Sequence, residues 1–70
     1  PVVISVSSND GLGINAKNIG TLMNMKNIFF VPFGQDSPSD KPNSLISNLD
    51  LLQASIICAL QGKQIQPVLI

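Results

Sequence analysis

The stretch that decides the fold is Ile28-Phe29-Phe30-Val31, followed directly by Pro32-Phe33-Gly34. A continuous apolar run of β-branched and aromatic residues, ended by residues that break regular structure, is typical of a strand buried on both faces. A similar run, Val2-Val3-Ile4 with Val6, ends in the turn-forming residues Ser7 to Gly11. We therefore predict two buried strands, one at the start of the chain and one near its middle.

Between these strands the apolar residues change to helical spacing. From Asn15, interpreted as the N-cap, apolar side chains recur every three or four positions until about Met25, which predicts a first helix. After the second strand, a polar loop from Gln35 to Asn43 contains two prolines and predicts an ordered surface connection.

A second helix is predicted after this loop, with Gly62 as its C-cap. Two starts are compatible with the sequence, Ser44 or Asn48, and the second places Asp50 in the first turn, where the helix dipole favours a carboxylate. The tail from Gln64 to Ile70 is predicted to be extended, with a proline that interrupts inner strand pairing. The apolar positions of this helix are Leu45, Leu49, Leu52, Ile56 and Leu60.

The order strand, helix, strand, helix indicates an α/β fold with parallel strands. Two such strands and two helices cannot cover both faces and both edges of a sheet. We therefore expect residues 1–70 to be the β-α-β-α C-terminal portion of a larger parallel-sheet fold. The simplest source of the missing cover is further strands and helices before Pro1, and neighbouring subunits are the alternative.

The composition excludes several classes of function. One cysteine, Cys58, and no histidine leave no disulfide framework, no zinc ligands and no activated thiol. Four lysines and four aspartates form no basic stripe for nucleic acid. No apolar run approaches the roughly 20 residues that span a bilayer, and no signal peptide is recognisable. With 44% hydrophobic and only 11% charged residues, the chain is predicted to be a cytoplasmic protein that buries surface against a partner.

Ligands in open α/β sheets gather beyond the carboxyl ends of the strands, which here means residues 7–15 and 33–43. The first segment includes Gly11-Leu12-Gly13-Ile14-Asn15-Ala16, a G-x-G-x-x-A pattern found in dinucleotide-binding loops. Four polar residues separate it from the strand, whereas that loop needs a tight turn directly off the strand. Turn and capping chemistry is the alternative interpretation of Ser7 to Asp10. Lys41 is either a solvated loop residue or a contact for an anionic group.

Three stretches carry a family resemblance: Pro1–Asn9, Asn15–Ile19 and Lys26–Asp36. They closely resemble the B-subunit family of the dipicolinate synthases. The resemblance continues through Lys41–Ser44 and Gln64–Pro67, so it covers essentially the whole chain but only the last part of the longer family members. That family is similar to the flavin-dependent cysteine decarboxylases, which are Rossmann-like and homo-oligomeric, often as trimers. The resemblance therefore implies that residues 1–70 are the C-terminal fragment of a single flavoprotein-like domain with a Rossmann-like three-layer parallel-sheet fold.

The resemblance also implies site residues. In the decarboxylases a P-x-M-N motif lies near flavin and substrate, and it aligns with Val6-Ser7-Ser8-Asn9, where only the asparagine is kept. Contacts to FMN are therefore implied for Ser7, Ser8, Asn9 and Asn18, while the family's main flavin-phosphate motifs belong to earlier segments. The loop after the second strand supplies the candidate substrate or loop contacts from its place at a strand end, and these are Gln35, Asp36, Lys41, Asn43 and Ser44. No catalytic residue and no metal ligand is assigned.

The function implied by the resemblance is that of one component of an oxidoreductase. It would act with the NAD(P)-type A subunit of dipicolinate synthase to convert dihydrodipicolinate to dipicolinate in the mother-cell cytoplasm during sporulation, and this chain alone would be inactive. Two alternatives remain open from the residues themselves. One is a noncatalytic oligomeric assembly module, and the other is a dinucleotide-binding βαβ unit.

Overall fold

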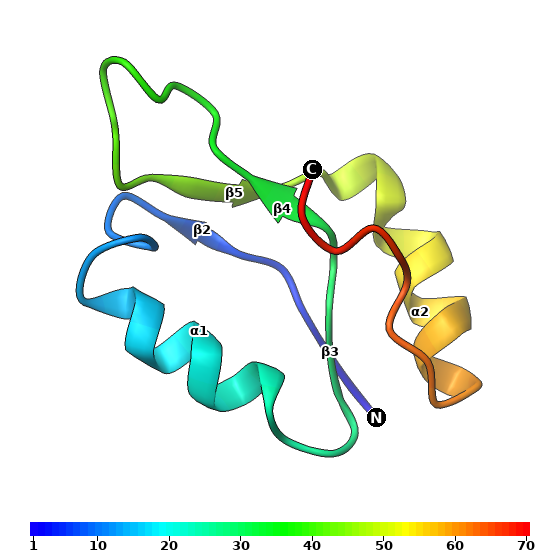
Figure 1. Cartoon of the computed structure of the whole chain (residues 1–70). Helices are drawn as coiled ribbons and strands as arrows, with labels where there is room; N and C mark the ends of the chain where they lie inside the picture. The colour runs from blue at the N-terminus through cyan, green and yellow to red at the C-terminus, as the bar shows by residue number, and fades with distance from the viewer.

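The computed structural model describes all 70 residues, from Pro1 to Ile70. The chain forms two helices and five short strands, and two of these strands make up a central pair (Figure 1). In chain order the elements are β1 (Val2–Ile4), β2 (Ser7–Ser8), α1 (Asn15–Met23), β3 (Ile28–Phe30), β4 (Phe33–Gly34), β5 (Leu45–Ser47), the 3₁₀ turn η1 (Leu49–Leu51) and α2 (Leu52–Leu60).

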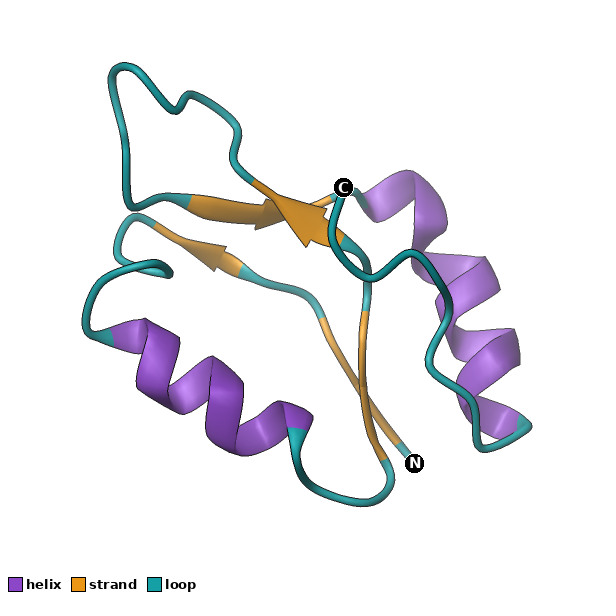
Figure 2. Ribbon diagram, in the orientation of Figure 1, coloured by secondary structure: helices purple, strands orange, loops and turns teal.

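The central sheet consists of β1 and β3, which pair in parallel with Val2 opposite Ile28 and Ile4 opposite Phe30. Helix α1 lies on one side of this pair and α2 lies on the other (Figure 2). The predicted α/β class with parallel strands is therefore confirmed. This arrangement follows from the two apolar runs, because strands without polar alternation need cover on both faces.

The core lies at the end of β3, where the chain continues from the parallel pair into β4. Phe30 and Phe33 are almost fully buried, with ring centroids 5.8 Å apart and planes tilted by 53°. Val6 and Leu45 complete this buried cluster. Tilted aromatic pairs at this separation stabilise a core beyond their buried area, so the run from residue 28 to 33 forms the centre of the molecule.

A second, antiparallel sheet was not predicted. It has the order β2-β5-β4, with Ser8 opposite Leu45 and Gly34 opposite Ile46. The prediction of a turn at Ser7-Ser8 was therefore wrong, and so was the inclusion of Leu45 in the second helix. Leu45 shares the helical spacing by coincidence, because pairing with two neighbouring strands and burial in the core override local periodicity.

The predicted starts of the two helices differ in outcome. Asn48 begins the second helical segment, because its side-chain oxygen accepts the Asp50 N–H at 3.0 Å, so this alternative is confirmed and the Ser44 start is wrong. Asn15 is the first residue of α1 rather than its N-cap, and the Asp10 carboxylate instead accepts the Ile14 N–H at 3.0 Å. The N-cap of α1 is Ile14, which offers no side-chain hydrogen bond, so the Asp10 bond secures the turn that leads into the helix.

Replacing Asp10 by alanine is expected to lower the free energy of unfolding by about 1 kcal/mol, the usual net value of one hydrogen bond. Asp40→Ala is the matched control, because Asp40 is exposed and its side chain makes no hydrogen bond. Urea unfolding of both variants checks the prediction. Equal midpoints for the two variants would show that Asp10 does not stabilise α1.

The C-terminal tail closes the outer edge of β3 and β4. The Gln64 side chain accepts the Phe30 N–H and donates to the Phe30 carbonyl, both at 2.7 Å. Further on, Phe33 donates to the Val68 carbonyl at 2.9 Å and accepts from the Ile70 N–H at 3.0 Å. The C-cap of α2 is Gln61 rather than the predicted Gly62, which follows it with a positive φ of 74° and donates to the Ala59 carbonyl. The tail is extended as predicted apart from bends at Gln66 and Val68.

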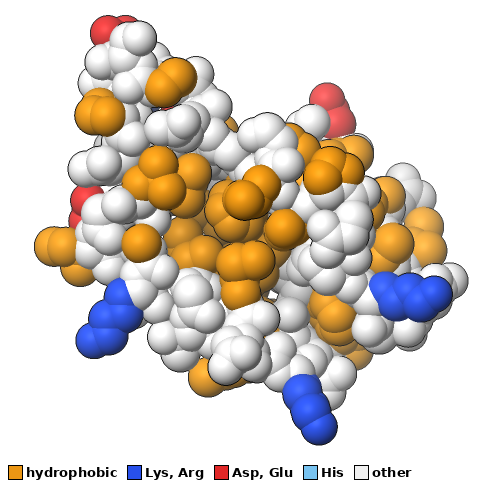
Figure 3. Space-filling view, viewed as in Figure 1, with side chains coloured by type: hydrophobic (Ala, Val, Ile, Leu, Met, Phe, Trp, Pro, Cys, Tyr) orange, Lys and Arg blue, Asp and Glu red, His pale blue; other side chains and the backbone are white.

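Much apolar surface stays uncovered in this unit. The outer edge of β1 has no strand partner, and Val2 on it is 54% exposed. Figure 3 shows apolar side chains spread over the face in view, with few charges between them. The expectation that two strands and two helices would leave a partly covered sheet is confirmed. The exposed aliphatic residues of η1 and α2 are Leu49, Leu52, Ile56, Ile57 and Leu60.

Candidate functional site

A polar cleft of about 240 Å³ lies where β2, β5 and the loop between β4 and β5 meet. Figure 1 shows that loop and the turn after β2 at the same end of the molecule. Leu12 of the turn donates to the Asn43 carbonyl of the loop at 2.9 Å, so the two segments are joined. The structure thus brings both predicted site segments to one cleft. Its lining residues are Ser7, Ser8, Asn9, Asp36, Lys41, Ser44, Leu45 and Ile46.

Three of the nine predicted contact residues do not line the cleft. Gln35 donates to the Pro42 carbonyl at 3.1 Å, and Asn43 holds the turn after β2 through its own carbonyl. Both residues therefore fix the loop. Asn18 is exposed on α1 and donates to the Asn15 side chain at 3.1 Å, so it reaches the cleft only through another residue.

Ser8 is the most constrained polar side chain of the cleft. Its hydroxyl oxygen accepts the Asp10 N–H at 3.1 Å and the Asn15 side-chain N–H at 3.0 Å. Asn15 is in turn oriented by Asn18, whose amide donates to its oxygen. The sequence indicated Asn15 only as a cap, and its position one residue inside α1 gave no sign that it holds a serine seven residues earlier.

The charges of the cleft are one lysine and one aspartate. Lys41 Nζ lies 4.0 Å from Asp36 Oδ2, with the two side chains 55% and 32% exposed. The side chain of Ser44 is the main group that holds the pKa of Asp36 below its usual value, and Lys41 lowers that pKa further. Asp36 is therefore ionised at neutral pH, and such an exposed ion pair contributes little to stability.

The G-x-G-x-x-A pattern is explained by packing. A Cβ on Gly11 would approach the Leu45 side chain to 2.8 Å, and a Cβ on Gly13 would overlap the Asp10 carboxylate. That carboxylate already accepts the Ile14 N–H at the start of α1. A negative group at this helix start disfavours a pyrophosphate, so the geometry favours a structural role for both glycines over dinucleotide binding.

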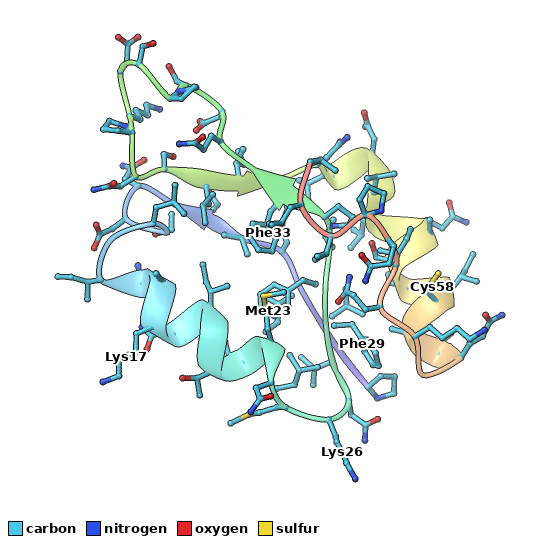
Figure 4. All side chains as sticks on the ribbon, viewed as in Figure 1. Lys17, Met23, Lys26, Phe29, Phe33 and Cys58 are labelled. Carbon is cyan, nitrogen blue, oxygen red and sulfur yellow. The ribbon has the colours of Figure 1, made fainter.

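A larger cavity of about 380 Å³ lies at the opposite end of β3, bounded by Met23, Met25, Phe29 and Gln64 among others. Figure 4 shows Met23 and Phe29 near the centre of the molecule and Cys58 on α2. Cys58 is half-buried with a free thiol.

No group of three or more acidic, cysteine or histidine residues could hold a metal ion. Neither nine-residue helix is long enough to cross a membrane.

The parallel pair with a helix on each face defines this unit as a Rossmann-like α/β structure. The chain is 53% identical, over all 70 residues, to the B subunit of dipicolinate synthase from Bacillus subtilis (strain 168), of which it covers 35%. It also matches the crystal structure of the B subunit of dipicolinate synthase from Bacillus halodurans with a TM-score of 0.99 and 56% identity, covering 100% of this chain and 36% of that one. No family model matches the chain. The resemblance seen in the sequence is confirmed, and the chain spans about a third of the length of both relatives.

Proposed function

We propose that this chain serves in the B subunit of a dipicolinate synthase. In this role it acts with a separate NAD(P)-type A subunit to convert dihydrodipicolinate to dipicolinate in the mother cell of a sporulating bacterium. The observation that carries the proposal is 53% identity to such a B subunit across the whole chain. The TM-score of 0.99 against a second protein of that name supports it. The activity belongs to the complete B subunit, because the chain covers only 35% of its relative.

The cleft chemistry is compatible with this proposal. The substrate and the product are both dicarboxylates, which need hydrogen-bond donors and a positive charge. Lys41 supplies the charge, and the hydroxyls of Ser7 and Ser8 with the amide of Asn9 supply donors. In this proposal the cleft residues of this chain bind and orient the ligand.

FMN is the cofactor implied by the resemblance, and the cleft fits it only in part. Ser7, Ser8 and Asn9 can hydrogen-bond polar atoms of a flavin. A volume of about 240 Å³ is below the roughly 300 Å³ at which pockets for whole drug-sized ligands begin. When bound, FMN would supply redox chemistry, and the residues of this chain would border one side of its site.

Dipicolinate formation by the complete B subunit together with the A subunit tests the proposal. With dihydrodipicolinate and NADP, the pair is expected to form dipicolinate, measured by its ultraviolet absorbance, and the A subunit alone is expected to form much less. Lys41→Gln should raise the KM about tenfold through loss of a charged contact. Lys17→Gln, on the exposed face of α1, is the matched control. Equal rates with and without the B subunit would contradict the proposal.

A noncatalytic assembly role is the second candidate, and the exposed aliphatic residues of α2 favour it. Leu60 is 71% exposed and Ile57 is 52% exposed. A helix that is apolar on most of its circumference is usually covered, so α2 is expected to pack against another protein chain or another part of the same one. Ile57→Asp should lower the sedimentation coefficient of the protein if α2 joins subunits, whereas Gln53→Asp, also exposed on α2, should not. An unchanged coefficient in both variants excludes this role for α2.

A further inference from the structure

The hydrogen bonds around Ser8 leave its proton without a partner in the protein. A serine hydroxyl has one proton to donate and two lone pairs that accept. Both lone pairs are used, by the Asp10 N–H at 3.1 Å and by the Asn15 amide at 3.0 Å. The hydroxyl donates to no protein acceptor, and Ser8 lines the cleft. Its proton is therefore directed away from these two donors and is available to a ligand.

We propose that Ser8 donates a hydrogen bond to a carboxylate of the bound substrate or product, that Asn15 is the positioning residue that aims this hydroxyl, and that Lys41 supplies the opposing charge. The inference rests on the proposed function for the identity of the carboxylate. Ser8, which the family resemblance assigns to FMN, then contacts a dicarboxylic acid instead.

Asn15 can perform this role because its amide is held in one orientation. Its oxygen accepts the Asn18 side-chain N–H at 3.1 Å, which fixes the amide nitrogen toward Ser8. An amide donor forces the serine to accept, and so leaves the serine proton for an acceptor outside the network. A carboxylate at position 15 would reverse this direction, because it would take the proton of Ser8 itself.

Of the two charged residues in the cleft, Lys41 favours the same kind of ligand. Lys41 and Asp36 are separated by 4.0 Å, beyond the distance of a direct hydrogen bond. A ligand carboxylate can therefore approach Lys41 without breaking a tight contact. Asp36 opposes the anion by repulsion. The volume of about 240 Å³ suits one carboxylate end of a small planar acid.

Titration calorimetry of the complete protein with pyridine-2,6-dicarboxylate as the probe tests the inference. Ser8→Ala and Lys41→Gln should each weaken binding about tenfold, because each removes a hydrogen bond to a charged group. Asp36→Asn should tighten binding severalfold through loss of repulsion. Ser5→Ala is the matched control, because Ser5 is exposed between β1 and β2 and lies outside the cleft.

The variant Asn15→Asp tests whether Asn15 orients the Ser8 hydroxyl or only stabilises the fold. It should weaken probe binding at least as much as Ser8→Ala. It should not lower the unfolding midpoint, because an acidic residue in the first turn of α1 is favourable. Ala16→Asp adds the same charge at the next, exposed position and should change binding by no more than about twofold.

The outcomes distinguish the inference from the proposed function. If the complete B subunit and the A subunit make dipicolinate but Ser8→Ala binds the probe like the unchanged protein, the inference alone is wrong. If the unchanged protein does not bind the probe, or if Ser8→Ala lowers only its flavin content, the inference is also overturned. If no dipicolinate forms while Ser8→Ala and Asn15→Asp still weaken probe binding, the inference holds and the proposed reaction fails.

Discussion

Replacing Ser47 by alanine is expected to lower the free energy of unfolding by about 2–4 kcal/mol. The Ser47 hydroxyl accepts the Val6 N–H at 2.8 Å and donates to the Val31 carbonyl at 3.1 Å. It therefore joins β5 to the chain just after β1 and to the chain just after β3. Val6 is 7% exposed and Val31 is 0% exposed, so water cannot replace the lost partner. Each buried group left without a partner costs about 1–3 kcal/mol.

Urea unfolding of the protein measures this effect, and Ser55→Ala is the matched control. Ser55 is 1% exposed and donates to the Leu51 carbonyl at 2.7 Å. That carbonyl precedes α2 and already accepts a backbone N–H of the helix, so loss of the serine hydroxyl should cost about 1 kcal/mol or less. A smaller loss for Ser47→Ala than for Ser55→Ala would show that Ser47 does not join the two sheets.

Replacing Gln64 by leucine is expected to lower the free energy of unfolding by a similar amount, about 2–4 kcal/mol. The leucine has a similar volume but cannot satisfy the N–H and carbonyl of Phe30, which the glutamine amide bonds at 2.7 Å each. Phe30 is 1% exposed and lies at the centre of the core. Loss of this contact opens the edge of β3 and releases the tail.

Two measurements check the Gln64 prediction. The urea midpoint should fall, and trypsin should cleave faster after the exposed Lys63, because local opening precedes cleavage. Gln61→Leu is the matched control, since Gln61 is exposed and its side chain makes no hydrogen bond. Equal midpoints and equal cleavage rates in both variants would contradict a role for Gln64 in closing the edge.

Most of the cleft could be predicted from the positions at which the two parallel strands end. Parallel strands end at the same edge of a sheet, so the segment after the first strand and the segment after the second were expected to meet. They do, and six of the nine predicted contact residues line the cleft. Gln35, Asn43 and Asn18 do not: Gln35 and the Asn43 carbonyl hold the loop, and Asn18 lies on α1 and bonds Asn15. Such local bonds depend on backbone paths that composition does not reveal.

Local patterns in the sequence determined the parallel pair and its two helices. The apolar runs at residues 2–4 and 28–31 and the helical spacing between them identify these elements because period and burial are properties of neighbouring residues. Only the tertiary structure decided the antiparallel sheet and the direction of the Ser8 hydroxyl. Val6 and Ser47 are 41 positions apart, and Ser8 and Asn15 are held by a turn whose path no periodicity encodes. Contacts between distant residues form only when the core packs. They place Leu45 in strand β5, although its spacing in the sequence is that of a helix.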